Sequence, residues 1–293
     1  MEPRIRPHLS SSNRASASDR SPGWRPSAAI RISLWLHAAI LAALPVFPNS
    51  WAWLLSILLG DHLVLALAGL WPKSALLGPN LARLPWAPAR NGLVVLTFDD
   101  GPDPEVTPAI LDLLDSHGAK ASFFCVGKQA QGHGALVREI IRRGHSVENH
   151  SFRHSNLFAC YPLGALQREI QRAQSAIAAS SGTAPRFFRA PMGFRNPFLD
   201  PALARSGLRY VSWTRRAFDT ACRKPETVLR RLIRNLCEGD ILLLHDGNSA
   251  RTAEGKPVSV QVLSTLLPIL DARGLRAVSL PMAMGNEPGS GAP

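Results

Sequence analysis

Two aspartates stand side by side at the end of an apolar run. The segment VLTFDDGP, residues 95–102, ends that run with Asp99 and Asp100 and continues with Gly-Pro. A plain turn is one interpretation, because Asp and Gly favour turns. Adjacent carboxylates repel each other, however, unless a positive charge lies beside or between them. The pair therefore predicts a cation that other parts of the chain help to hold.

The segment HSFRH, residues 150–154, supplies two imidazoles four residues apart. Together with Asp100, His150 and His154 form a ligand set that suits a divalent metal such as zinc, with positions left open for water and substrate. If Asp100 is a ligand, Asp99 can stay ionised beside it and take a proton from water near the metal. The alternative is that His150 caps a strand and His154 faces solvent.

A third histidine closes the apolar run LLLH, residues 242–245. A histidine after an apolar strand is more often structural than catalytic. His245 is nevertheless expected to act as a general acid toward a leaving amine, because its strand should end beside those of Asp99 and His150. These residues thus predict a base, a metal site and an acid.

The elements that must position these groups alternate along the chain from residue 93 onward. Apolar runs predict about seven strands, at 93–98, 121–126, 146–150, 186–191, 208–213, 240–246 and 275–280. Patterns with helical period predict helices at 107–118, 135–145, 163–182, 226–239 and 260–274. Apolar strands alternating with helices indicate a parallel sheet or barrel of the α/β class, near but short of a complete eight-stranded barrel. Functional groups collect at the carboxyl ends of such strands.

The N-terminal part of the chain is basic and then apolar. The chain carries a net charge of +12, and six arginines lie in residues 1–31, which we expect to be a disordered tail. Apolar runs follow at 32–47 and 51–71, and the second is long enough to span a membrane. Two spans forming a hairpin, a single span and a cleaved signal peptide are the alternatives. Because a basic flank favours the cytoplasmic side, the hairpin predicts an inner-membrane protein with a cytoplasmic catalytic domain, whereas a single span places that domain outside.

The remaining boundaries follow from composition. Residues 72–90 are rich in proline, which predicts a linker. We expect the catalytic domain to span residues 91–282 and a flexible tail to span residues 283–293. Nucleic acid is not an expected partner, because net charge alone is weak evidence for it and the basic tail leads into apolar segments.

Five motifs occur in order: TFDDGP, HSFRH, RAPMG, Trp213 with the later Asp219, and LLLH. Over residues 91 to about 280 they resemble the NodB-homology polysaccharide deacetylases, carbohydrate esterase family four. The resemblance implies a distorted (β/α)7-type barrel. It also implies metal-dependent removal of an N-acyl group, usually acetyl, from an amino sugar.

The resemblance assigns roles to residues of this chain. Asp99 matches the catalytic base, Arg189 the arginine that holds it, His245 the general acid and Asp219 the acidic residue that tunes it. The matched metal ligands are Asp100, His150 and His154. Trp213 and Leu243 match the pocket for the acyl methyl group, and the backbone N–H of Met192 matches an oxyanion donor. Three positions depart from the family pattern: Met192, where many relatives carry an aromatic residue, Thr220, where many carry tryptophan, and Glu148, where a small residue is common.

The expected function is therefore that of a membrane-anchored, metal-dependent N-deacetylase acting on an amino sugar in a polysaccharide, an oligosaccharide or a lipid-linked glycan. Zinc is the expected metal, with cobalt or another divalent ion as the alternative, and the expected partners are the glycan and membrane lipid. Two other functions are alternatives. One is a non-catalytic carbohydrate-binding protein on the same scaffold, and the other is a deformylase or deacylase of a lipid-linked amino sugar.

Overall fold

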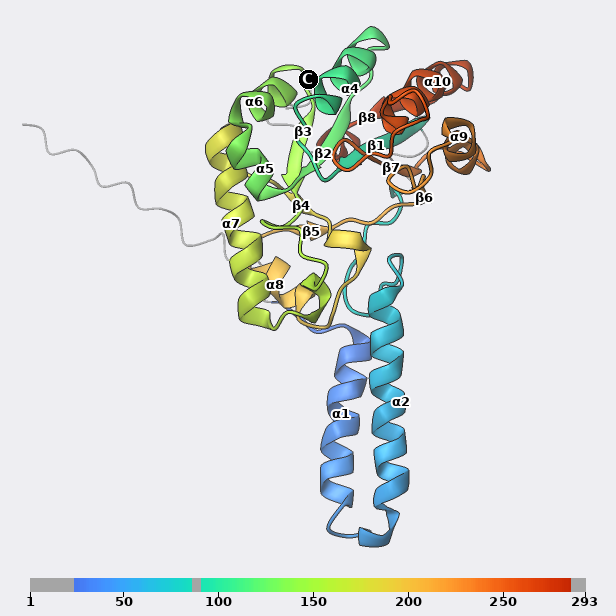
Figure 1. Cartoon of the computed structure of the whole chain (residues 1–293). Coiled ribbons are helices and arrows are strands. Elements are labelled where there is room, and N and C mark those ends of the chain that lie inside the picture. Colours follow the sequence, from blue (N-terminus) through green and yellow to red (C-terminus); the bar gives the residue numbers. More distant parts are fainter. Residues whose placement is uncertain (1–23, 86–90, 286–293) are drawn as a thin grey trace, which may run out of the picture.

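A computed structural model describes residues 24–85 and 91–285 of the chain. It consists of a helical hairpin that projects from an α/β domain (Figure 1). Of the tails predicted for residues 1–31 and 283–293, residues 1–23 and 286–293 lie outside the described residues, as does the part of the linker at 86–90. The second tail is corrected at its start, because Ala283 is buried in the last helix of the domain.

The hairpin consists of α1 (Ala28–Ala43), the short 3-10 helix η1 (Pro48–Ser50) and α2 (Trp51–Leu70), with α1 and α2 side by side (Figure 1). Helix α1 begins four residues before the predicted apolar run because the Ser27 hydroxyl caps it, accepting a hydrogen bond from the N–H of Ile30 at 3.3 Å. It ends at Ala43, before Pro45, which cannot continue a helix. The first predicted segment, 32–47, is therefore corrected to a helix over 28–43, and residues 28–31 do not belong to a disordered tail.

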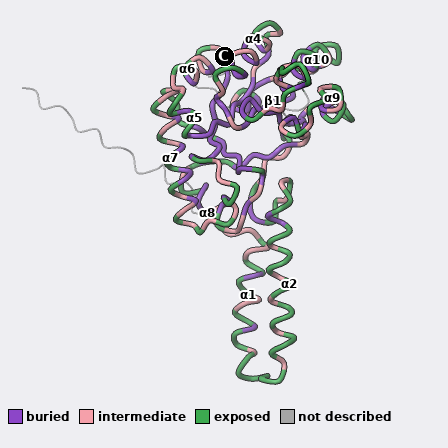
Figure 2. The backbone as a smooth tube through the Cα atoms, viewed as in Figure 1, coloured by how far each residue is buried: buried purple, intermediate pink, exposed green. Residues whose placement is uncertain are grey.

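The surface of the hairpin is largely apolar and exposed (Figure 2). The helical stretch Pro48–Leu70 is long and apolar enough to cross a membrane, whereas α1 is shorter. The carboxylate of Asp61 on α2 accepts a hydrogen bond from the Ser33 hydroxyl of α1 at 2.6 Å. Asp61 therefore faces the partner helix.

Within the described residues, eight parallel strands form the sheet of the α/β domain. They are β1 (Leu93–Asp99), β2 (Ala121–Cys125), β3 (Ser146–Asn149), β4 (Phe187–Phe188), β5 (Arg209–Tyr210), β6 (Arg215–Arg216), β7 (Ile241–His245) and β8 (Arg276–Val278). Their order is β5-β4-β3-β2-β1-β7-β6, and β8 pairs with β1. The sheet curls as the predicted distorted barrel, so the fold class is confirmed. Strand β6 was not expected, because its two residues are both arginines and belong to no apolar run.

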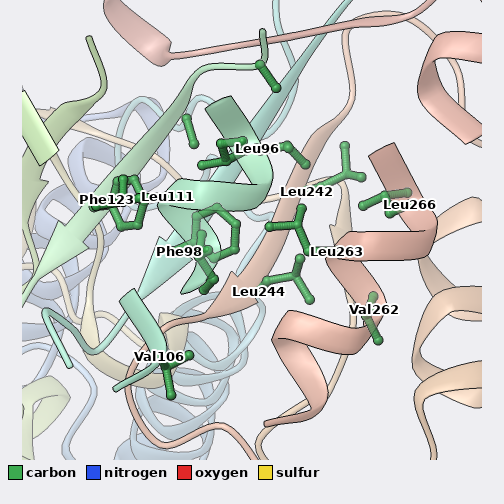
Figure 3. Packing of buried hydrophobic residues seen from close by; sticks show 14 of the residues in the cluster. Leu96, Phe98, Val106, Leu111, Phe123, Leu242, Leu244, Val262, Leu263 and Leu266 are labelled. Atoms are coloured by element: carbon green, nitrogen blue, oxygen red, sulfur yellow. The ribbon is translucent and has the colours of Figure 1, made fainter. Parts of the chain in front are cut away.

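Helices cover the outside of this sheet (Figure 1). They are α4 (Val106–Ser116), α5 (Gly127–Gly132), α6 (Gly134–Arg142), α7 (Leu163–Ser181), α8 (Leu199–Arg205), α9 (Pro225–Ile233), α10 (Val258–Ala272) and α11 (Leu280–Ala283). The main core packs β1, β2 and β7 against α4 and α10, with Phe98, Leu244 and Leu263 among its fully buried side chains (Figure 3). Burying each of these contributes about 1.5–3 kcal/mol, so the strands that end at the site are firmly held.

Residues 72–85 are part of the domain, not a free linker. Leu81 forms a parallel bridge with Val211, and Arg83 forms an antiparallel bridge with Asp240. Leu84 is buried in the second core cluster, beside the barrel strands. The composition of this stretch predicted a linker because prolines interrupt its periodicity, but its leucines fill space beside the sheet.

The end of the hairpin is tied to the loop that follows β4. The backbone N–H of Arg195 donates to the carbonyl of Gly69 at 3.1 Å, and its buried guanidinium donates to the carbonyls of Ser74 and Gly78. A Cβ at position 69 would lie 2.2 Å from the Arg195 carbonyl oxygen, so only glycine permits this approach. The hairpin therefore has a defined place against the catalytic domain.

Candidate active site

The carboxyl ends of the strands converge on one cavity of about 230 Å³. In the parallel register Asp99 at the end of β1 lies directly opposite His245 at the end of β7. Of the ten residues predicted for the site, eight line this cavity: Asp99, Asp100, His150, His154, Met192, Trp213, Leu243 and His245. The other two, Arg189 and Asp219, are fully buried behind it.

Three ligand-type atoms meet at Asp100. Its Oδ1 lies 3.3 Å from His150 Nε2 and 3.1 Å from His154 Nε2. The ring of His150 donates Nδ1–H to the carbonyl of Arg189 at 2.8 Å, so in the neutral ring Nε2 carries a lone pair. Asp100 Oδ1 is buried and accepts no hydrogen bond from the described residues. Converging lone pairs repel one another, and a divalent cation is the group that this donor set fits.

The backbone around these ligands is unusual. Asp100 has φ +76°, Ser151 +63° and His154 +52°, a region that side chains other than glycine rarely adopt. The turn between the two histidines is held by local hydrogen bonds: Asn149 Oδ1 accepts from the N–H of Ser151, and Ser151 Oγ accepts from the N–H of His154. Strain of this kind concentrates at functional sites, where the surroundings hold the side chains in place.

The electrostatics of the three ligands favour positive charge between them. Burial raises the pKa of Asp100, but the close imidazole of His150 outweighs burial and holds that pKa well below its usual range. Burial lowers the pKa of His150, whereas the carboxylates of Asp99 and Asp100 raise it above its ordinary value. Burial and the neighbouring His150 lower the pKa of His154. Asp100 is thus ionised and His154 neutral near pH 7, the forms in which they bind metals.

Asp99 is held by a buried arginine. Its Oδ1 accepts a hydrogen bond from Arg189 Nη1 at 2.6 Å, and the same nitrogen donates to Thr97 Oγ1 at 2.8 Å. The Arg189 guanidinium also stacks on the ring of Phe124, 4.1 Å from its centroid. Asp99 Oδ2 is left on the side of the metal ligands, 3.8 Å from His150 Nε2. One oxygen therefore anchors the carboxylate, and the other faces the reaction space.

His245 is paired with Asp219. Its Nδ1 lies 2.8 Å from Asp219 Oδ1, and its backbone N–H donates to Asp219 Oδ2 at 2.8 Å. Burial by itself lowers the pKa of His245, but the charge and hydrogen bond of Asp219 outweigh burial and raise that pKa to about 9. The ring is therefore protonated near neutral pH. Its Nδ1–H is committed to Asp219, which leaves the Nε2–H for the cavity.

An apolar wall lines part of the cavity. Trp213 and Leu243 are buried there, and Met192 lies at the mouth, 43% exposed. Met192 has φ +58°, and within residues 24–85 and 91–285 no group accepts a hydrogen bond from its backbone N–H. The structure thus places a free main-chain donor beside an apolar surface. The roles of these three residues stay predictions.

Three further polar residues belong to the site and were missed from the sequence. Thr97 supports Arg189 and lies two residues before Asp99, on the same face of β1, which was the available signal. Asn248 donates from Nδ2 to Asp100 Oδ2 at 3.2 Å from a loop without any pattern. Arg216 lines the cavity from the unexpected strand β6.

Known proteins are similar to this chain in sequence and in fold. The family model for polysaccharide deacetylase matches residues 87–211. A chitooligosaccharide deacetylase of Bradyrhizobium sp. (strain ANU 289) is 34% identical over 64% of this chain and 89% of its own. A peptidoglycan-N-acetylglucosamine deacetylase of Bacillus cereus is 32% identical over 66% of this chain and 88% of its own.

Among solved structures, the Bc1960 peptidoglycan N-acetylglucosamine deacetylase superposes with a TM-score of 0.64 at 28% identity, covering 71% of this chain and 94% of that one. The family 4 carbohydrate esterase from Streptomyces lividans superposes with a TM-score of 0.57 at 30% identity, covering 64% of this chain and 92% of that one. The chain therefore belongs to the NodB-homology polysaccharide deacetylases, carbohydrate esterase family four, and is a hydrolase of amide bonds.

Proposed function

We propose that the protein is a membrane-anchored, divalent-metal-dependent deacetylase of an N-acetylated amino sugar in a polysaccharide, an oligosaccharide or a lipid-linked glycan. One observation carries this proposal. The unpaired ligand atoms of Asp100, His150 and His154 converge between a buried carboxylate, Asp99, and a protonated imidazole, His245.

The chemistry follows from these positions. A divalent cation held by Asp100, His150 and His154, with zinc the best fit to the donor set, would supply Lewis-acid activation of the amide and of water. Asp99 takes a proton from the water whose oxygen bonds to the carbonyl carbon. His245 then gives its Nε2 proton to the nitrogen as the carbon–nitrogen bond breaks, and acetate and a free amine leave.

The surrounding residues orient these steps. Arg189 fixes the direction of the Asp99 carboxylate through the 2.6 Å hydrogen bond. Trp213 and Leu243 offer an apolar surface for the acetyl methyl group. The free N–H of Met192 is available to the oxygen that gains negative charge during attack.

The hairpin bears on where the reaction occurs. Both of its open ends lie at the catalytic domain (Figure 1), so a hairpin that crosses the bilayer leaves the chain on the side it started from. Arg25 and Arg31 at the start of α1 and Lys73 after α2 favour the cytoplasmic side. The preferred assignment is a catalytic domain at the cytoplasmic face of the inner membrane, where lipid-linked or nascent glycans would be substrates. An external domain would instead meet cell-wall or exported polysaccharide.

Two experiments test these assignments. Full-length protein purified in detergent and loaded with zinc or cobalt should release acetate from N-acetylglucosamine oligomers or a lipid-linked N-acetyl sugar, and Asp99→Asn should not. Absence of acetate from every such substrate would leave the non-catalytic carbohydrate-binding function, and formate from an N-formyl sugar would favour the deformylase. A reporter fused after Pro293 that is active only outside the cytoplasm reports the side of the domain.

A further inference from the structure

The short strand β6 carries two adjacent arginines that point in different directions. Successive residues of a strand lie on opposite faces of the sheet. Arg215 donates from Nε to the buried carboxylate of Asp240 at 3.0 Å, on the side away from the cavity. Arg216 lines the catalytic cavity instead. Only the second arginine is therefore placed to meet a substrate.

Arg216 has no acidic partner within the part of the chain that the structure describes. Its Nε is shielded from solvent and makes no hydrogen bond there. The nearby catalytic carboxylates are already paired, Asp99 with Arg189 and Asp219 with His245. A shielded N–H without an acceptor is unfavourable, and the residue as a whole is half-buried, so this guanidinium is available to a group that the protein itself does not supply.

Two aromatic rings hold Arg216 in place. Its guanidinium carbon lies 5.2 Å from the ring centroid of Trp213 and 4.9 Å from that of Phe218. Phe218 has φ +59°, an unfavourable conformation for an aromatic residue, and its side chain is exposed at the domain surface. When a guanidinium stacks on ring faces, the N–H groups at its edge stay free. These N–H groups point outward in the plane of the guanidinium, in a geometry that matches two oxygens of a phosphate or carboxylate.

The wall that carries Arg216 lies at the end of the hairpin. Lys73, three residues after α2, donates from Nζ to the carbonyl of Thr214 at 2.9 Å. Pro72 lies against Gly193, where an added Cβ would be 3.2 Å from Pro72 Cβ. An oxyanion bound at Arg216 would thus sit near the point where the chain leaves the hairpin. Phosphate groups linking sugars to lipid lie at that level if the hairpin spans a membrane.

We infer that Arg216 determines specificity by binding a phosphate joined to the amino sugar that is deacetylated. The preferred substrate is then a phosphorylated N-acetyl amino sugar instead of a neutral glycan. This inference rests on the proposed deacetylase function and narrows its substrate class. The phosphate belongs to a lipid-linked sugar or to a soluble sugar phosphate.

The test uses zinc-loaded full-length protein in detergent and three probes. They are N,N′-diacetylchitobiose, its 1-phosphate, and the same disaccharide linked to polyprenyl pyrophosphate. The variants are Arg216→Gln and Arg216→Lys. The lysine variant keeps the positive charge but loses the paired N–H donors of the guanidinium. The control is Arg230→Gln, which removes an exposed arginine of α9 whose side chain donates a hydrogen bond to Thr227 Oγ1. Melting temperatures in the same detergent verify folding.

The wild-type protein is expected to have a higher kcat/KM for the phosphorylated probes than for the neutral one. Arg216→Gln should lower kcat/KM for the phosphorylated probes about tenfold or more, mainly through KM, the loss expected for one charge-assisted hydrogen bond. For the neutral probe, kcat/KM of Arg216→Gln should differ from the wild-type value by less than about threefold. For the phosphorylated probes, kcat/KM of Arg216→Lys should lie between those of the wild type and Arg216→Gln, and that of Arg230→Gln should equal the wild-type value. Preference for the lipid-linked probe over the 1-phosphate assigns the phosphate to lipid, and the reverse assigns it to a soluble sugar phosphate.

Equal losses on neutral and phosphorylated probes would overturn the inference, as would a wild-type protein that shows no preference for phosphate. Failure of the deacetylase proposal itself looks different. In that case no probe is hydrolysed. The affinities of the wild type and Arg216→Gln for the disaccharide 1-phosphate can still be compared by calorimetry.

Discussion

Replacing Asp219 by asparagine should move the pH range in which the enzyme works. In the wild type, burial lowers the pKa of His245, and the charge and hydrogen bond of Asp219 raise it past its ordinary 6.5 to about 9. That rise corresponds to roughly 3 kcal/mol of net stabilisation of the protonated ring. The Asp219→Asn substitution keeps the shape of the side chain and removes its charge, so burial would dominate and the pKa of His245 would fall below 6.5.

The sign of the effect follows from the role of His245 as an acid. The protonated form is present below the pKa and is lost as pH rises through it, so the alkaline limb of kcat/KM should move down by more than about 2 pH units. The ratio of wild-type to variant activity should increase about tenfold per pH unit between the two pKa values and reach about 300-fold above pH 9. A bound cation lowers both pKa values through its positive charge, so the difference between the two proteins is the quantity to measure.

The assay is acetate release by zinc-loaded protein from pH 5.5 to 10, with the melting temperature recorded at each pH. Asp271→Asn is a matched control, because Asp271 pairs with His117 at the same 2.8 Å on the surface, far along the chain from the site. Its pH profile should equal that of the wild type. If Asp219→Asn lowers the rate by one factor at every pH and leaves the alkaline limb in place, Asp219 only positions His245 and the electrostatic reasoning is wrong.

Three further predictions concern other residues. Asp99→Asn should lower kcat about 10²- to 10⁴-fold with metal content unchanged, measured by elemental analysis; a lost metal would show that Asp99 is a ligand. His150→Ala should reduce bound zinc below one per chain and abolish activity, and retention of zinc would remove it from the ligand set. Burial raises the pKa of Glu148 from 4.5 to about 7 despite hydrogen bonds from the N–H groups of Phe187 and Arg186. Its stabilising contribution is therefore full below pH 4.5 and lost as pH rises through about 7, so Glu148→Gln should flatten the dependence of melting temperature on pH, and identical slopes would contradict this.

Much of the active site was predictable because its residues end strands. Asp99 and His245 each close an apolar run, His150 follows the short extended segment 146–149, and parallel strands bring their carboxyl ends to one edge. The fold class followed from the same alternation of strands and helices. These signals are local, since periodicity and strand ends are properties of short segments.

The resemblance to a family, and not periodicity, identified Asp219 and Arg189 as the residues behind His245 and Asp99. The structure adds distances that no sequence pattern contains, such as the 2.8 Å between Asp219 Oδ1 and His245 Nδ1. The free state of Arg216 could not be predicted from the sequence. It depends on which acidic groups lie within reach, and its neighbour Arg215 shares its residue type and strand but pairs with Asp240.

The sequence by itself determined which groups the chain can offer: a carboxylate pair, three histidines of which His150 and His245 lie at strand ends, and two apolar segments before the domain. The tertiary structure decided which of them are partnered, that residues 72–85 close against the barrel, and that Arg195 ties the loop after β4 to the end of α2. The physical reason is that a residue's identity limits the bonds it can make. The bonds that form depend on atoms brought close by folding from far along the chain.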